Sequence, residues 1–285
     1  MAEERQAPSG EDKEGQADDP SLSETEEREV EERSPPRARV VHAAVIKQGE
    51  DEFERPAGSL FWSGLAAGIA IMASVWAQAA LHQHLPDAPW RESVAGLGYT
   101  LGFLIVILGR MQLFTEHTMV AVLPLAMETS RRNLTRTARL WTIVFAGNVV
   151  GAAVIAAVCA WGRVQSPELL GAMVEVSSKL LEKSAGDILL QGIPAGFLIA
   201  SIAWIRSAAD DSSFWIVIAL TYPIALCGFT HVIAGAAEAF LLLWTGNAGF
   251  GWVLGGFLLP ALIGNIIGGT GLFAMLAHAQ VKAEI

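Results

Sequence analysis

The chain has few of the residues that stabilise secreted domains or bind nucleic acid. It contains only two cysteines, Cys159 and Cys227, which are too few for a disulfide framework. Both lie in apolar runs, where a buried free thiol is the ordinary state. No basic segment followed by a short apolar run opens the chain, so no signal peptide is predicted. The formal net charge is -10, and no nucleic acid partner is predicted.

Charge is scarce after residue 55. Residues 1–55 hold 17 acids and 8 bases, whereas the rest of the chain holds only 12 acids and 11 bases. The first part is rich in Glu, Ser and Pro, which is typical of a disordered, solvated segment. We therefore expect an acidic, mostly disordered tail over 1–55, a transmembrane domain over 56–280 and a short terminus over 281–285. Ala38–Phe53 is expected to form a short surface helix before the membrane begins.

Six apolar runs are long enough to cross a membrane, which takes about 20 helical residues. They cover Leu60–Leu81, Val94 to about Met127, Leu140–Trp161, Ile188–Trp204, Phe214–Trp244 and Val253 to about Ala277. The predicted fold class is an all-α membrane protein with six transmembrane helices and both termini on one side. The positive-inside rule makes that side cytoplasmic, because it carries Arg55, Arg131, Arg132, Arg136, Arg139 and Arg206.

The second and fifth runs are too long for plain spans, and both are interrupted. The interruptions contain Gly109–His117 and Gly228–His231. Three local patterns recur in the same order in the two halves: Gly64–Gly68 with Gly192–Gly196, Phe114–His117 with Phe229–His231, and Gly147–Gly151 with Gly264–Gly268. Three crossings per half predict two inverted three-helix repeats with helices 2 and 5 broken. Such matched breaks are typical of a midplane site in a transporter or channel.

The two breaks predict a polar site between apolar walls. Irregular backbone is tolerated in a bilayer only where it lines a cavity or is buried in protein, and each new helix N-terminus offers free N–H donors. Thr115, Thr230 and His231 add polar side chains, and the walls are Tyr99, Phe103, Leu113, Phe114, Ile224 and Phe229. A dry apolar constriction opposes a bare ion. The site therefore fits a weak acid, although water or another small neutral solute fits the same walls.

These residues resemble those of the formate/nitrite transporter (FNT) family, most closely its YfdC-like branch. The resemblance is carried by Leu97–Thr100, Gln112–Glu116, Ala121–Pro124, Thr230–His231 followed by Gly235, Gly264–Asn265 with Gly268–Gly269, and His278–Gln280. It implies a homopentamer in the cell inner membrane, whose protomers each have an aquaporin-like shape and their own pore. It implies passage of small monovalent weak-acid anions such as formate, nitrite, hydrosulfide, acetate or lactate, with no enzymatic activity and no cofactor.

The resemblance also implies roles for individual residues. His231 would be the central pore histidine, and Leu113–Thr115 would be the interrupted loop of the second helix. Tyr99, Phe103 and Ile224 would fall at the cytoplasmic and periplasmic constrictions.

Charged residues near the breaks carry two further expectations. The family has a lysine outside the fourth helix that draws anions into a vestibule, and Lys179 or Lys183 would take this role. Arg110 lies in the interrupted second helix, and an arginine at membrane depth needs a partner. Glu116 or Glu238 could pair with it. Arg110 is then either a brace for the broken helix or an anion site, and a pair across the pore would close it.

The chain departs from the formate-channel pattern at several positions, which leaves the substrate open. Gly196 replaces an asparagine that would donate to the pore, and Thr230 replaces an acid before the central histidine. Arg110, Gln112 and Glu116–His117 also differ. Asn148 and Asn265 are expected to satisfy backbone groups at close helix contacts, and His82 and His84 are expected at the surface.

Three other functions compete with a weak-acid channel. The first is an aquaporin-like channel for neutral solutes. The chain lacks the Asn-Pro-Ala pair of ordinary aquaporins, but permeation of a neutral solute stays open. An intramembrane enzyme needs a nucleophile–base pair or a metal cluster, and Thr230 and His231 have no evident third group. A non-conducting envelope scaffold would use the acidic tail to bind a partner and would have a blocked pore.

Overall fold

The computed structural model describes residues 34–284, and every regular element in that range is helical. The chain from Arg37 to Ile285 forms one compact unit. The disordered tail expected over the first residues lies, for residues 1–33, outside the described part. Five segments are long and apolar enough to cross a membrane: Ala57–His84, Arg91–Leu108, Arg131–Trp161, Ala185–Ala208 and Trp252–Val281. The prediction of an all-α membrane protein is confirmed.

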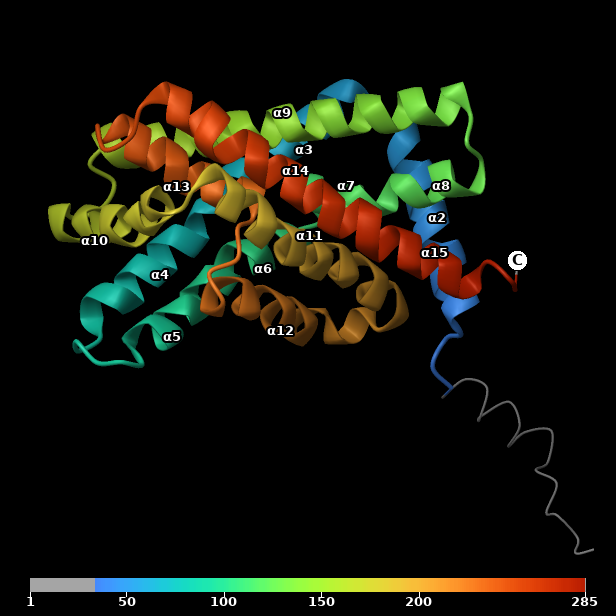
Figure 1. The fold of residues 1–285 in the computed structure, drawn as a ribbon, viewed down its shortest axis with the longest axis horizontal. Coiled ribbons are helices and arrows are strands. Elements are labelled where there is room, and N and C mark those ends of the chain that lie inside the picture. The colour runs from blue at the N-terminus through green and yellow to red at the C-terminus, as the bar shows by residue number, and fades with distance from the viewer. Residues whose placement is uncertain (1–33, 285) are drawn as a thin grey trace, which may run out of the picture. The chain divides into compact units, whose positions relative to one another are not determined.

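The five segments are built from single helices or from helices that follow one another directly (Figure 1). The first joins α3 (Ala57–Ala70) to α4 (Met72–His84), and the second joins α5 (Arg91–Ala95) to α6 (Thr100–Leu108) through a 3₁₀ turn. The third and fourth are α9 (Arg131–Trp161) and α11 (Ala185–Ala208). The last contains α14 (Leu259–Ile266) and α15 (Met275–Val281), each preceded by a π-helical segment.

Two further stretches are interrupted helices, as the sequence predicts. After α6 the chain is not helical over residues 109–113, and it then forms α7 (Phe114–Val120) and α8 (Val122–Met127). After α12 (Ser213–Leu226) it turns at Gly228 and forms α13 (Val232–Trp244). Gly228 has φ +66°, a left-handed conformation that glycine adopts without a steric cost. The first break is shorter than expected, because Phe114–His117 are already helical.

Glycines bring two pairs of helices into close contact. A Cβ atom on Gly68 of α3 would lie 2.1 Å from the carbonyl oxygen of Asn148 in α9. A Cβ atom on Gly196 of α11 would lie 2.2 Å from the carbonyl oxygen of Asn265 in α14. Small residues of this kind let helix backbones approach each other in a bilayer. Gly196 is therefore a helix-packing residue at this contact.

The short helix predicted before the membrane is α2, which runs from Ala38 to Glu54. It buries Val45 and Phe53 and packs against α7, α8, α9, α11 and α15. A Cβ atom on Gly49 would lie only 2.3 Å from the carbonyl oxygen of Val120. The compact unit thus begins at Arg37 and includes α2, ahead of the domain boundary expected after residue 55.

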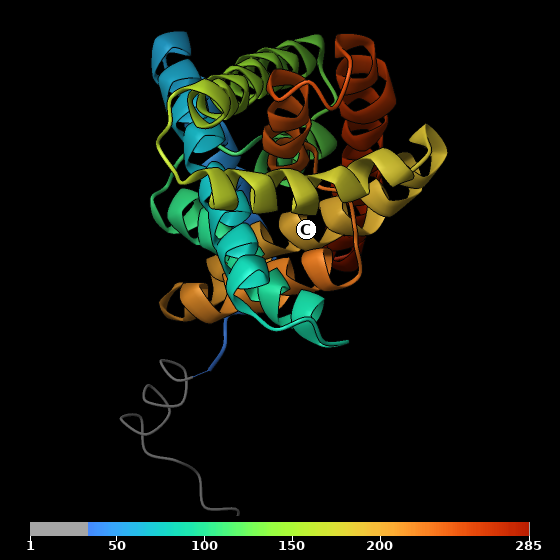
Figure 2. The same ribbon diagram turned by 90° about the vertical axis from the view of Figure 1, so that its left-hand side faces the viewer.

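The sequence reading missed α10, which runs from Pro167 to Ser178. Figure 2 shows it lying across one end of the bundle, where it contacts α4 and α13. The Ser166 side chain accepts a hydrogen bond from the Leu169 N–H group at 3.2 Å, and proline occupies the first helical position. Serine followed by proline is a helix-start signal that was available from the sequence.

Candidate functional site

The N-termini of α7 and α13 meet inside the bundle through one polar contact. Thr115 Oγ1 lies 2.8 Å from His231 Nε2, and both side chains are buried. His231 Nδ1 accepts a hydrogen bond from the Ala234 N–H group at 3.1 Å. Since Nδ1 is an acceptor, Nε2 of the neutral ring carries the proton. Nε2 therefore donates a hydrogen bond to the Thr115 hydroxyl oxygen. The structure thus brings together the histidine and the threonine that the sequence assigns to the two breaks.

Aromatic and aliphatic side chains surround this contact. The Phe103 ring meets the His231 ring edge-on, with centroids 5.0 Å apart, and Tyr99 packs against Phe103 at 5.2 Å. Leu113 and Phe103 are fully buried. The Phe114 ring packs at 5.1–5.6 Å against two aromatic rings of α9, so it supports the wall from behind. The His231–Thr115 contact is therefore enclosed by apolar groups.

Two asparagines hold the broken backbones in matching ways. Asn148 accepts from the N–H group of Phe114 at 2.9 Å and donates to the carbonyl groups of Gln112 and Gly64, each at 2.8 Å. Asn265 accepts from the N–H group of Val232 and donates to the carbonyl groups of Thr230 and Gly192, all at 2.9 Å. Each amide thus uses its acceptor and both its donor hydrogens. The predicted role of the asparagines in satisfying backbone is confirmed.

These bonds also fix how the two breaks correspond. Phe114 in the first break matches Val232 in the second, because each donates its N–H to the equivalent asparagine. The sequence letters instead suggested that Phe114 matches Phe229, an offset of three residues. In the structural register His231 corresponds to Leu113. Each occupies the N-cap position of its half-helix, but only the His231 side chain accepts a capping hydrogen bond.

A cavity of about 520 Å³ opens beside α2, and we call it the α2-side vestibule. Charged side chains at its wall form ion pairs: Arg110 with Asp210 at 2.9 Å, and Arg206 with Asp210 at 3.3 Å and with Glu116 at 3.7 Å. The expectation that Arg110 pairs with Glu116 or Glu238 at membrane depth is wrong. Arg110 adopts φ +54°, and its side chain is 71% exposed at the cavity mouth.

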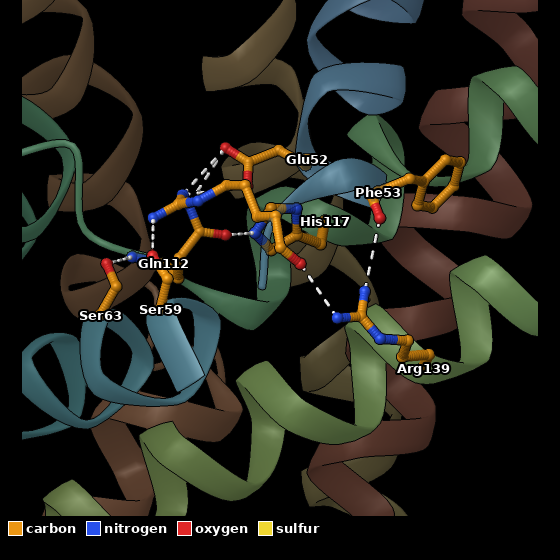
Figure 3. Close-up of polar contacts among 8 residues, drawn as sticks. Glu52, Phe53, Ser59, Ser63, Gln112, His117 and Arg139 are labelled. Atoms are coloured by element: carbon orange, nitrogen blue, oxygen red, sulfur yellow. Dashed lines mark hydrogen bonds and ion pairs between the residues drawn. The ribbon is translucent and has the colours of Figure 1, made fainter. Parts of the chain in front are cut away.

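The end of α2 is tied to the first break (Figure 3). Gln112 donates to the Glu52 carboxylate at 3.2 Å, and its side-chain oxygen lies 2.5 Å from His117 Nε2. The Gln112 N–H group donates to Ser63 Oγ at 3.2 Å. Arg139 donates to the Phe53 carbonyl oxygen at 3.4 Å. The loop before α7 is therefore held from two sides, by Asn148 within the bundle and by this network at its rim.

A smaller cavity of about 90 Å³ lies next to His231, and we call it the lysine-side cavity. It is lined by Gln78, Tyr99, Val176, Lys179, Leu180, Lys183, Ile224, Ala225, Gly228, Phe229, Thr230, His231, Gly235 and Glu238. Lys183 Nζ donates to the Gly228 carbonyl oxygen at 2.6 Å, close to the end of α12, where a cation is favoured. Lys179 instead forms an ion pair with Glu92.

Burial lowers the pKa of Lys183, while the nearby carboxyl groups of Glu238 and Asp187 oppose that change. Both candidate lysines thus lie at the cavity, and Lys183 is the one that contacts the break. Tyr99 and Ile224 line this same cavity, whereas Phe103 contacts His231 itself.

Two positions differ in importance from what the sequence suggested. Glu238 was considered only as a partner for Arg110, but it lines the lysine-side cavity. The signal for it was helical spacing, because a residue seven positions after His231 lies on the same helix face. His82 was expected at the surface, but it is buried, with its ring nitrogens 2.9 Å from Glu92 and 3.1 Å from Glu175.

Comparison with known proteins agrees with this architecture. A model of the family described as formate/nitrite transporter matches residues 39–279. The inner membrane protein YfdC of Escherichia coli is 35% identical over 90% of this chain and 82% of its own length. The formate channel FocA of Haemophilus influenzae is 26% identical over 61% of this chain and 63% of its own length.

Solved structures show the same fold at low sequence identity. A pentameric formate channel with formate bound aligns with a TM-score of 0.68 at 19% identity, over 80% of this chain and 98% of that chain. An FNT family ion channel aligns with a TM-score of 0.71 at 18% identity, over 85% and 98%.

Proposed function

Because the chain belongs to the formate/nitrite transporter family, whose members are channels and transporters rather than enzymes, we propose that it conducts small monovalent anions of weak acids, with formate and nitrite as the first candidates. The path runs from the α2-side vestibule past His231 and Thr115 to the lysine-side cavity. The hydrogen bond between Thr115 and His231 is the observation that carries this proposal. In this proposal the neutral imidazole lies between the two broken helices, at the narrow point of the path between the two cavities.

The walls at His231 determine the form in which a weak acid crosses. Phe103 and Leu113 are fully buried and offer no compensation to a charge. Moving an unpaired carboxylate-sized ion into such surroundings costs far more than moving a neutral acid, whose remaining cost is about 2–7 kcal/mol for unmet hydrogen bonds. The His231 and Thr115 side chains reduce that smaller cost by hydrogen bonding. The solute therefore passes the constriction as the neutral acid, or in a hydrogen-bonded step that leaves little net charge.

The protomer consists of two inverted three-helix repeats, in which α12 and α13 together form the fifth crossing. The equivalent hydrogen bonds of Asn148 and Asn265 support this symmetry. So do the matching close contacts at Gly68 and Gly196. The crossings lie within residues 56–280, and α2 packs against them at the α2-side vestibule.

The protein is an inner membrane homopentamer with both termini in the cytoplasm. The pentameric assembly of a structural neighbour supports the proposed pentamer. The name of the YfdC relative supports the location in the inner membrane. The basic residues that flank α8 and α9 support the orientation. The α2-side vestibule is then cytoplasmic, and the lysine-side cavity faces outward.

The test is transport by purified protein in liposomes. Uptake of formate, nitrite, acetate and hydrosulfide is followed at several pH values, with wild-type protein and with His231→Ala. We expect uptake that increases as the fraction of neutral acid increases and that changes its pH dependence in His231→Ala.

Control measurements separate the other functions. Protein-free liposomes report the leak of neutral acid through lipid, and a neutral solute such as glycerol reports aquaporin-like permeation. Uptake of the neutral solute without any uptake of weak acid would contradict the proposal and support a neutral channel. Wild-type liposomes that behave like protein-free ones for every solute would support a non-conducting scaffold.

A further inference from the structure

The lysine-side cavity contains a carboxyl group that the proposed path does not yet use. Between His231 and Leu242, Glu238 is the one residue that is not buried by protein, so its side chain faces the cavity. It follows His231 by seven positions, and Gly235 lies between them on the same helix face and lines the same cavity. The Phe257 ring packs against Gly235, 2.2 Å from where a Cβ atom would lie, and the cavity that Glu238 and His231 both line is what relates the carboxyl group to the ring.

Opposite charges surround this carboxyl group. Lys179 and Lys183 line the cavity from the segment before α11, and both lysines act electrostatically on Glu238. Within the described part of the chain, no hydrogen bond or ion pair holds Glu238 in place. Removal from water favours a protonated carboxyl group, whereas nearby ammonium groups favour an ionised one.

A second polar group in the cavity has no partner. The Thr230 hydroxyl is 98% buried and lines the cavity, yet it forms no hydrogen bond within the described residues. Buried polar groups are normally paired, so this hydroxyl is available to a solute. The cavity volume of about 90 Å³ suits a solute of a few heavy atoms. Ammonium groups, a free hydroxyl and a carboxyl group are together the chemistry that recognises a small oxyanion and exchanges a proton with it.

We propose that Glu238 is the proton-exchange residue of this channel. An anion held by Lys183 and Thr230 takes the proton of the Glu238 carboxyl group, so that the O–H bond of Glu238 breaks and an O–H bond forms on the solute. The neutral acid moves on to His231, and the Glu238 carboxylate is balanced by the two lysines until solvent water outside the cavity returns a proton. Transport in the other direction reverses these steps. This inference rests on the proposed weak-acid function.

Three variants test the role of Glu238 in liposomes, with formate as the probe. Glu238→Gln keeps the shape of the side chain and removes its proton exchange, and Glu238→Asp restores a carboxyl group. Glu175→Gln is the matched control, because it removes an exposed carboxylate from the same end of the protein. At neutral pH we expect Glu238→Gln to lose about a hundredfold in formate uptake, the usual contribution of a positioned acid. At acidic pH, where formic acid is already neutral, its uptake should approach the wild-type rate.

Several outcomes overturn the inference. An equal loss at every pH would give Glu238 a structural role only, and faster uptake at neutral pH would mean that its charge merely repels anions. Unchanged uptake would exclude any role. If the wild-type protein takes up no weak acid, the proposed function itself is refuted. If the wild type takes up formate and Glu238→Gln takes it up equally well, only the proton-exchange step is refuted.

Infrared difference spectra between acidic and neutral pH give a readout that does not depend on transport. Subtracting the difference spectrum of Glu238→Gln from that of the wild type should leave a protonated-carboxyl band that belongs to Glu238. No band left by this subtraction would contradict titration of this group. Elution of each variant at the wild-type oligomer size controls for folding.

Discussion

At the scale of single residues, each half of the bundle depends on one asparagine. Asn148 and Asn265 each satisfy one N–H group and two carbonyl groups of broken backbone. No other neutral side chain of this size offers one acceptor and two donor hydrogens from a single amide. Breaks that would leave polar groups unpaired in a bilayer are therefore closed by a side chain from a neighbouring helix.

Replacing this amide should destabilise the fold. Asn265→Leu leaves the Val232 N–H group and the carbonyl groups of Thr230 and Gly192 without partners. Each unpaired buried group costs about 1–3 kcal/mol, so we expect a loss of about 3 kcal/mol or more in unfolding free energy. Thermal unfolding in detergent measures it. Asn247→Ala, at an exposed turn, is the control, and equal melting of both variants would contradict the role of Asn265.

The hydroxyl of Thr115 should matter for conduction more than for folding. Thr115→Val keeps the shape of the side chain but removes the acceptor for His231 Nε2. We expect weak-acid uptake to fall about tenfold, equivalent to about 1.4 kcal/mol for one hydrogen bond. Thr115→Ser retains the hydroxyl and should restore uptake. Equal uptake by the valine and serine variants would show that the hydroxyl is not used.

At the scale of elements, close helix packing and the docking of α2 define the two ends of the path. α3 lies against α9 and α11 against α14 with almost no side chain between them. This contact places each asparagine within reach of the break in its own half. At the rim, α2 reaches the first break through Gln112 and reaches α15 through a contact of 3.2 Å between His42 Nε2 and His278 Nδ1.

Adding a methyl group at the close contacts should separate these helices. Gly196→Ala places a Cβ atom 2.2 Å from the Asn265 carbonyl oxygen, and overpacking of this kind typically costs about 1–3 kcal/mol. Gly171→Ala in α10 meets no atom within 4 Å and should gain up to about 1 kcal/mol from helix propensity. Thermal unfolding compares the two variants. A neutral Gly196→Ala would mean that the helices can shift apart without loss.

The docking of α2 on α15 should weaken in acid. Burial, and then the neighbouring His278, lowers the pKa of His42 below its ordinary value of 6.5. A histidine with a lowered pKa in the folded state contributes stability above its unfolded pKa, and that contribution is lost as the pH falls through the folded-state pKa. The protection of α2 amides against hydrogen exchange, corrected for the intrinsic exchange rate at each pH, should therefore fall below pH 6.5 in wild-type protein.

His42→Gln should remove most of this acid effect, because glutamine does not titrate. His84→Gln changes an exposed histidine and should leave the effect in place. Acid-induced exchange of α2 that is the same in all three proteins would assign the effect to another group.

At the scale of the whole molecule, polar groups collect at the two cavities and large apolar side chains cover the outside. Leu190, Trp215 and Leu276 are each more than 60% exposed in a single protomer. Large apolar side chains exposed in this number face lipid or other subunits. Purified in a mild detergent, the protein should therefore give a native mass of five copies. A monomer that still transports weak acids would contradict the pentamer.

The sequence by itself determined the all-α membrane class, five of the six predicted crossings and the two breaks. Long uncharged runs can be buried only in a bilayer, and glycine with polar residues inside them predicts interruption. It also singled out Thr115 and His231, because polar side chains at membrane depth are costly unless they line a path.

Only the tertiary structure decided which of the predicted residues meet. The hydrogen bonds of Asn148 and Asn265 shifted the register of the two breaks, since side chains from other helices fix it. Arg110 turned outward to Asp210 because of its backbone conformation. Glu238 gained its place in the cavity from the packing of α13, an arrangement of distant segments that local sequence patterns do not encode.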